Sequence, residues 1–129
     1  MRLLLDTHAF LWALFEPERL PALTREQLED RQQEVLLSTV VVWEIAIKAA
    51  LGKLPIQRPV ASWLPAYAEA LGCRLLAVHL DHALAVEDIP LHHRDPFDRL
   101  LIAQAQVEQA TLVSADRVFA RYDLPLLWA

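Results

Sequence analysis

The chain has 129 residues, of which 55% are hydrophobic, and its formal net charge is −5 at pH 7. This composition excludes a disordered chain, and the length suits one compact domain over residues 1–129. No apolar run reaches the roughly 18 residues of a membrane helix and the amino terminus lacks a signal-peptide pattern, so we expect no membrane partner.

Short apolar runs with the length of strands alternate along the chain with longer segments of helical periodicity. The runs that predict strands are residues 2–5, 35–38, 74–78, 111–114 and 126–128. Such alternation is typical of βα units rather than of a helical bundle or a sandwich of two sheets. The predicted fold class is therefore α/β, with a central parallel sheet of four to five strands flanked by helices.

Helices are predicted between these strands, over residues 7–15, 24–32, 40–51, 61–71, 82–88 and 96–109. Thr24 followed by Gln27 resembles a capping box at the start of the second helix. Ser38 can cap the third helix. Asp95 can cap the last helix, and Pro96 suits its first position.

Acidic residues lie near the ends of several predicted strands. Asp6 directly follows the first strand, and Asp116 lies just beyond the fourth. Glu44 falls in the helix after the second strand, and Asp98 in the helix before the fourth. The carboxyl ends of parallel strands meet at one edge of a sheet, where ligands bind, so these four side chains could converge.

Converging carboxylates would need cations. Two unit charges about 4 Å apart repel by roughly 1 kcal/mol in water and by roughly 4 kcal/mol at an effective dielectric constant of about 20. Carboxylate oxygens suit Mg²⁺ or Mn²⁺, and such ions can activate water for phosphodiester hydrolysis. The functional interpretation is a shared acidic metal site.

Each acid also has a structural interpretation. Asp6 and Asp116 can cap helices, and Glu44 precedes Lys48 by four residues, the favourable order for a surface ion pair. Asp95 already fills the capping position of its helix, which leaves Asp98 in the first turn without that role. Spacing alone leaves both interpretations open.

The chain resembles the VapC-type toxins of the PIN-domain family in ordered blocks that span nearly its whole length. These blocks are residues 4–8, 42–48, 52–54, 93–105 and 112–116. The resemblance implies a PIN-like three-layer sandwich and a Mg²⁺- or Mn²⁺-dependent endoribonuclease that acts as the toxin of a type II toxin–antitoxin pair. It further implies RNA as the substrate, a cognate VapB-like antitoxin as the partner, and a homodimer.

The resemblance also assigns residues to the site. It implies that the catalytic metal ligands are Asp6, Glu44, Asp98 and Asp116, with Asp95 as an accessory. Hydroxyl groups close to these acids in sequence can orient them or can cap helices: Thr7, Ser38 and Ser114. Basic residues that flank the site are predicted to contact RNA phosphates: Arg94, Arg99 and Lys48.

Other reactive or bulky residues receive structural interpretations. No histidine has a conventional ligand spacing, so none is predicted to bind metal: His8, His79, His82, His92 and His93. The lone Cys73 is expected to be a packing residue, which fits a reducing cytoplasm. Aromatic residues at helical spacings belong to the core or line a groove for the antitoxin or a second copy: Trp12, Phe15, Trp63 and Tyr67.

Two other functions are compatible with acids at the ends of strands. A Mg²⁺-dependent phosphatase would need a second Asp two residues after the first, and His8 stands there instead. A non-catalytic PIN-fold module that only binds RNA or protein would be expected to have lost metal acids, and all four are present.

Overall fold

The protein, described over residues 1–129 by a computed structural model, is built on one five-stranded sheet with the order β3-β2-β1-β4-β5. Every pair of neighbouring strands is parallel. The strands are β1 (Arg2–Leu5), β2 (Glu34–Ser38), β3 (Cys73–Leu76), β4 (Thr111–Ser114) and β5 (Leu126–Trp128). The predicted α/β class with a parallel sheet is confirmed.

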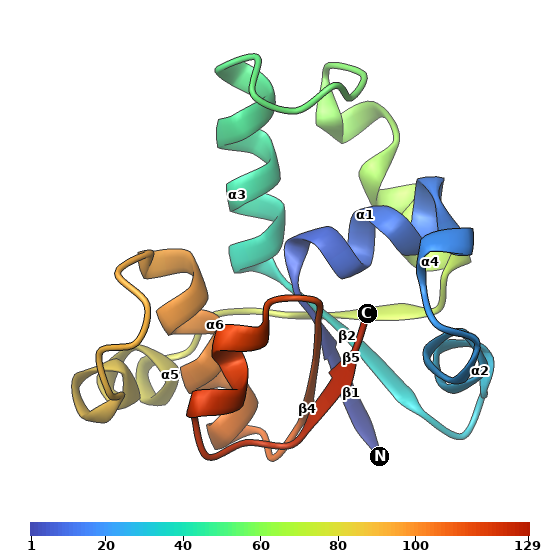
Figure 1. Ribbon diagram of the computed structural model, residues 1–129. Helices are drawn as coiled ribbons and strands as arrows, with labels where there is room; N and C mark the ends of the chain where they lie inside the picture. Colours follow the sequence, from blue (N-terminus) through green and yellow to red (C-terminus); the bar gives the residue numbers. More distant parts are fainter.

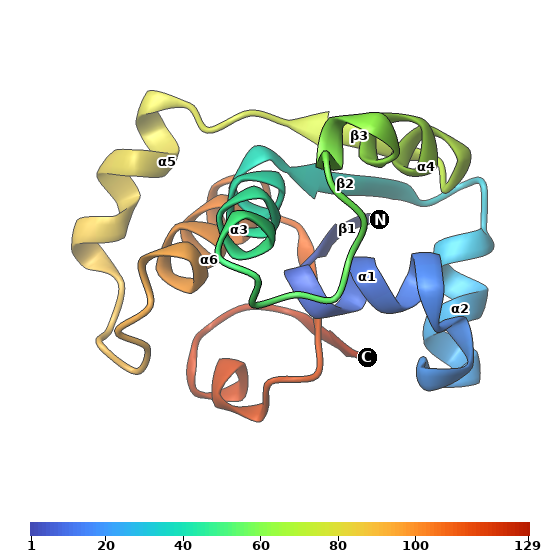
Figure 2. The ribbon, with the colours of Figure 1, turned by 90° about the horizontal axis from the view of Figure 1, so that it is seen from above.

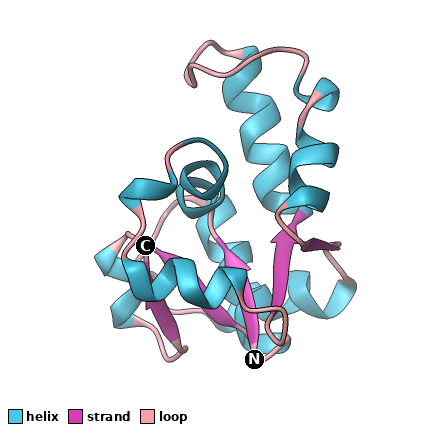
Figure 3. Cartoon of the chain, turned by 90° about the vertical axis from the view of Figure 1, so that its right-hand side faces the viewer, coloured by secondary structure: helices cyan, strands magenta, loops and turns pink.

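Six α-helices surround the sheet. They are α1 (Thr7–Phe15), α2 (Ala22–Glu29), α3 (Thr39–Ala50), α4 (Leu64–Ala70), α5 (Leu80–Ala85) and α6 (Pro96–Val107). Seen from above in Figure 2, α5 and α6 lie on one side of the strands, and α1 and α2 lie on the other. Figure 1 shows α3 rising beyond the sheet, and Figure 3 shows helices on both sides of the strands. The layers are those of the expected three-layer sandwich.

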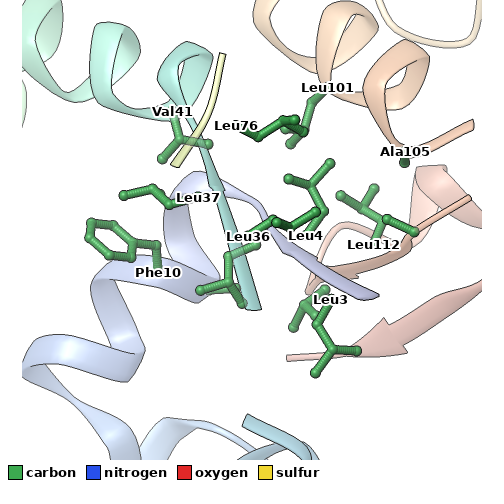
Figure 4. Close-up of a cluster of buried hydrophobic side chains, with 14 of the residues drawn as sticks. Leu3, Leu4, Phe10, Leu36, Leu37, Val41, Leu76, Leu101, Ala105 and Leu112 are labelled. Atoms are coloured by element: carbon green, nitrogen blue, oxygen red, sulfur yellow. The ribbon is translucent and has the colours of Figure 1, made fainter. Parts of the chain in front are cut away.

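The core lies between these layers and is made largely of aliphatic side chains. Leu3, Leu4 and Leu5 of β1 are fully buried, as are Leu36 and Leu37 of β2. Continuous apolar runs of this kind are what a parallel sheet covered on both faces requires. Figure 4 shows the strand leucines gathered with residues of three helices, among them Phe10, Val41 and Leu101.

The predicted capping box at Thr24 is wrong. Helix α2 begins at Ala22, directly after Pro21, and ends at Glu29 rather than at Gln32. The Thr24 hydroxyl donates to the carbonyl oxygen of Trp128 at 2.5 Å, because β5 passes beside this helix. The Thr24 hydroxyl, which the local pattern assigned to a helix cap, is therefore used in a tertiary hydrogen bond.

Two other helices are shorter than predicted. The segment 61–71 splits into a 3₁₀ turn, Val60–Ser62, and α4, whose start is fixed by Pro65 in its first turn. The segment 82–88 becomes α5 followed by the 3₁₀ turn Val86–Asp88. None of the helices combines the length and the apolar character that crossing a bilayer demands.

Candidate metal-binding active site

The site forms where β1 and β4 lie side by side at the centre of the sheet. The chain leaves β1 toward β2 on one side and later returns on the other side as β4, so this is the switch point at which α/β sheets bind ligands. Asp6 follows β1 and accepts a hydrogen bond from the Ala9 amide at 2.8 Å, which caps α1. Ser114, the last residue of β4, donates its hydroxyl to the other oxygen of Asp6.

Glu44 reaches the same edge from α3. This helix begins at Thr39 because the Ser38 hydroxyl accepts the Val40 amide at 3.0 Å. The Glu44 side chain is buried, with Oε1 accepting from the Thr7 hydroxyl and Oε2 from the Lys48 ammonium, each at 2.5 Å. The predicted ion pair with Lys48 therefore exists, but it holds a buried carboxylate and not a surface one.

Asp98 stands in the first turn of α6. Asp95 caps this helix as predicted, because its Oδ1 accepts the Phe97 amide at 2.8 Å and the Asp98 amide at 3.4 Å. The Asp98 carboxylate itself receives no hydrogen bond from the protein, although it is partly buried. Burial, together with the nearby charge of Asp95, raises the pKa of Asp98 to about 6. An acid in this state gains from a cation.

Asp116 lies just beyond β4 and is the best solvated of the four acids. Its Oδ1 accepts the Val118 amide at 3.0 Å, and its Oδ2 lies 2.9 Å from Nε2 of His93. Burial alone raises the pKa of Asp116, but the hydrogen bonds from His93 and the Val118 amide lower it overall. The other ring nitrogen of His93 lies 2.8 Å from the Tyr122 hydroxyl, and this contact fixes the imidazole ring.

The sequence-based interpretation missed His93. One ligand atom each from His93, Asp98 and Asp116 lie within 4.8 Å of one another, a spacing at which they could hold one metal ion. The absence of a conventional ligand spacing in the sequence thus did not reveal that His93 lies at the acidic site. The signal available in the sequence was its position, five residues before Asp98 in the segment that leads into α6.

The four acids act on one another electrostatically. Burial raises the pKa of Asp6, and the charge of Glu44 adds to the shift. The charges of Glu44 and Asp116 also contribute to the raised pKa of Asp98. Oxygen-rich ligands with one imidazole nitrogen at the margin fit Mg²⁺ or Mn²⁺, which favour carboxylate oxygen.

The hydroxyl groups divide into two sets. Thr7 and Ser114 donate to Glu44 and Asp6, so both hold a carboxylate of the cluster in place. Ser38 does not contact any of the acids. Its hydroxyl donates to Oε1 of Gln104 on α6 while it caps α3, so of the two roles predicted for Ser38 the structure has the helix cap and not the contact with an acid.

The three basic residues predicted to contact RNA differ in their surroundings. Arg99 donates to backbone carbonyl oxygens on both sides of a loop, those of Val86, Ile89, Pro90 and His93, at 3.1 to 3.5 Å. Its guanidinium closes the loop that carries His93, so the structure gives Arg99 a role as a loop anchor, and its contact with RNA stays a prediction. Lys48 is occupied by Glu44, whereas Arg94 is exposed.

Comparison of the sequence with known proteins identifies the family of the chain. The model of the PIN domain matches residues 3–124. The chain is 30% identical to Ribonuclease VapC22 of Mycobacterium tuberculosis over 115 residues, which cover 88% of this chain and 86% of that protein. It is 43% identical to Ribonuclease VapC16 of the same organism over 60 residues, which cover 46% of this chain and 41% of that protein.

A solved structure has the same fold. A chain of VapBC2 from Rickettsia felis, crystallised bound to a DNA fragment from the promoter, superposes with a TM-score of 0.76 at 17% identity. The match covers 100% of this chain and 99% of that chain. From the family model and the curated relatives together, the chain belongs to the PIN-domain family, in its VapC-type branch.

Proposed function

We propose that this protein is a Mg²⁺- or Mn²⁺-dependent endoribonuclease and the toxin component of a type II toxin–antitoxin pair. The observation that carries the proposal is the set of four acids at the β1–β4 switch point. Asp98 among them is partly buried, has no hydrogen-bond donor, and has a pKa raised to about 6. The names of the relatives, both ribonucleases, support RNA as the substrate.

In this proposal Asp6, Glu44, Asp98 and Asp116 hold the metal. The bound metal would supply an activated water and neutralise charge on the leaving oxygen of the phosphodiester. Thr7 and Ser114 keep Glu44 and Asp6 oriented through the hydrogen bonds described above. No side chain is needed as a nucleophile.

In this proposal the RNA is bound by basic side chains that have no partner within the protein. Exposed Arg94 is proposed to contact a phosphate, since it lies only four residues from Asp98. Of the three flanking cations predicted to contact RNA, Lys48 is paired with Glu44 and Arg99 is bonded to the loop, which leaves Arg94. A bound metal would also attract the phosphate and so contribute to RNA binding as well as to cleavage.

The first test is the thermal stability of the protein with Mn²⁺ and with a chelator. At about 100 times Kd, binding should stabilise the wild type by roughly 2.7 kcal/mol, and the gain should be lost in Asp98→Asn. Asp123→Asn, which changes an exposed acid near the end of the chain, is the matched control and should keep the gain. RNA cleavage should follow the same pattern. Equal stabilisation of Asp98→Asn and wild type would contradict the proposed metal site.

The partner is proposed to be a VapB-like antitoxin that inserts an apolar segment beside α1 and α4. A cavity of about 510 Å³ there is lined by all four aromatic residues singled out in the sequence: Trp12, Phe15, Trp63 and Tyr67. The Phe15 and Trp63 ring centroids are 5.3 Å apart, and Phe15 and Tyr67 are 48% and 46% exposed. Rings left open to solvent in a hollow of this kind are suited to an apolar peptide.

Antitoxin binding can be tested separately from catalysis. Phe15→Ala should weaken antitoxin binding by at least tenfold, because exposed rings in such hollows become anchors on binding. Leu23→Ala, at a residue of α2 that is 59% exposed, serves as the control. Unchanged antitoxin affinity in Phe15→Ala would move the partner to another surface.

A further inference from the structure

An aromatic pair stands next in sequence to two of the acids of the site, and the proposed function does not use it. Trp43 of α3 and Phe97 of α6 meet edge to face, with ring centroids 5.0 Å apart and an interplanar angle of 73°. Trp43 immediately precedes Glu44, and Phe97 immediately precedes Asp98. The same two helices that deliver two of the acids therefore also deliver the two rings, and Figure 2 shows α3 beside α6.

The pair is not part of the hydrophobic core. Neither ring belongs to the core cluster or to the side chains packed against it, and the Trp43 side chain is 57% exposed. Its neighbours Val41 and Ile45 on the same helix are almost fully buried, so α3 turns its largest side chain toward solvent. Phe97 meets the indole edge to face, and the exposure of Trp43 leaves more than half of its surface open to a ligand.

The charge of the molecule favours a nucleobase on this open face. With a net charge of −5 and a cluster of carboxylates at the site, the protein as a whole offers no net electrostatic attraction to a phosphate chain. Binding of RNA therefore needs a contact that does not depend on charge. Stacking of bases on aromatic side chains is such a contact, and it serves single-stranded RNA, whose bases are free to turn outward.

We infer that Trp43, supported by Phe97, stacks a base of single-stranded RNA next to the phosphodiester held at the acids. This inference rests on the proposed function, because it assumes that RNA is the substrate. It adds a base-binding subsite to a site that otherwise recognises only the backbone. Because every base has a π face, the subsite would tolerate different bases and would fix position more than sequence.

The test compares a short single-stranded RNA of mixed sequence with the same ribose-phosphate chain lacking all bases. Fluorescence anisotropy gives the affinity of each, with Ca²⁺ in place of Mn²⁺ and intact RNA verified on a gel. The wild type should prefer the base-bearing chain by about tenfold. Trp43→Ala should lose that preference, and Trp43→Phe should retain most of it. Leu23→Ala, which removes an exposed apolar side chain of α2 outside the site, should behave as the wild type.

The outcomes separate the inference from the proposed function. Stabilisation by Mn²⁺ should be the same in Trp43→Ala and in the wild type, because Glu44 and the other acids are unchanged. An unaltered base preference in Trp43→Ala would overturn the inference even if the wild type cleaves RNA. If Trp43→Ala instead turns a dimer into a monomer while the base preference persists, the ring serves a second copy and the inference is wrong. Absence of Mn²⁺ stabilisation and cleavage in the wild type would refute the proposed function instead.

Discussion

Asp98 is an acid whose charge the protein leaves largely uncompensated. Its pKa is about 6 in the folded chain against an ordinary value of 3.8, because burial and the charge of Asp95 disfavour the ionised form. Because this carboxyl pKa is raised on folding, ionised Asp98 destabilises the metal-free fold above about pH 6. The destabilisation disappears as the pH falls toward the ordinary pKa of the group. We therefore expect Asp98→Asn to raise the melting temperature in chelator at neutral pH, and the gain to vanish near pH 4.

Melting curves in chelator across this pH range test the expectation. Asp123→Asn is again the control, since its carboxylate is exposed. A melting temperature for Asp98→Asn below that of the wild type at neutral pH would show that the carboxylate stabilises the metal-free fold.

Other residues show why local patterns predict only part of the site. Asp6 and Asp116 each cap a helix or turn through one carboxylate oxygen, while the other oxygen contacts Ser114 or His93. A cap therefore does not exclude the proposed role as a metal ligand, and spacing alone could not choose between the two. His93 was missed because its place depends on a loop that Arg99 closes through backbone carbonyls. Such a contact leaves no periodic trace in the sequence.

At the scale of elements, side-chain contacts of Glu108 tie the start of β1 to α5 and α6. Glu108, after α6, lies 2.8 Å from Nε2 of buried His82 and 2.9 Å from a guanidinium nitrogen of Arg2. The hydrogen bond with His82, with a further one from Arg2, lowers the pKa of Glu108 below its ordinary value of 4.5. Because this carboxyl pKa is lowered on folding, ionised Glu108 stabilises the fold at pH values above its ordinary pKa. This stabilisation is lost as the pH falls through the lowered pKa.

Glu108→Gln should therefore cost about 1 kcal/mol at neutral pH, a figure kept small because solvent reaches the pair. The loss should shrink as the solution is acidified below the ordinary pKa. Urea unfolding at several pH values measures it, with Glu87→Gln as a control on a nearby exposed acid. A loss that stays constant with pH would mean that packing, and not charge, explains the effect.

Gln104 links the two helices that carry Glu44 and Asp98. It is fully buried; its Oε1 accepts from Ser38, the cap of α3, and its Nε2 donates to the Ala77 carbonyl at 3.2 Å. Gln104→Ala would leave these buried groups unpaired and should cost about 1 to 3 kcal/mol.

Ser38→Ala should cost about 1 kcal/mol through the lost cap. Because the two residues share a hydrogen bond, the double variant should lose less than the sum of the single losses. Chemical unfolding of all three variants measures the coupling, and strict additivity would show that the link between α3 and α6 is not energetic.

For the whole molecule, alternation of apolar runs and helical segments sufficed to predict a parallel sheet, because buried parallel strands must be apolar throughout. The strand order β3-β2-β1-β4-β5 could not be predicted from the apolar runs, because each predicted strand could pair with several others until the helices are packed. Helix ends were predicted where a local cap dominates, as at Asp95, and were misplaced where a distant strand competes for the side chain, as at Thr24. The acids converge only because the order of the strands brings β1 beside β4.

An exposed apolar face on α5 suits contact with a second copy of the chain, and we propose a homodimer that uses this helix. Leu80 and Leu84 are one helical turn apart, so they share a face, and they are 75% and 62% exposed. A C₂ interface places the same patch on both subunits, so a single apolar face is sufficient to start one. Leu84→Glu should then shift the protein to monomers in sedimentation velocity, because two like charges would meet across the axis without solvent.

Leu23→Glu changes a residue of α2 that is also 59% exposed, and it should leave the sedimentation coefficient unchanged. If both variants stay dimeric, the interface lies elsewhere. If both become monomeric, general loss of apolar surface explains the result and α5 has no special role. A shift confined to Leu84→Glu, with Mn²⁺ stabilisation retained, would place the dimer contact on a helix that packs against α6. The first turn of α6 holds Asp98, so the metal site and the dimer contact would then be built on adjacent elements.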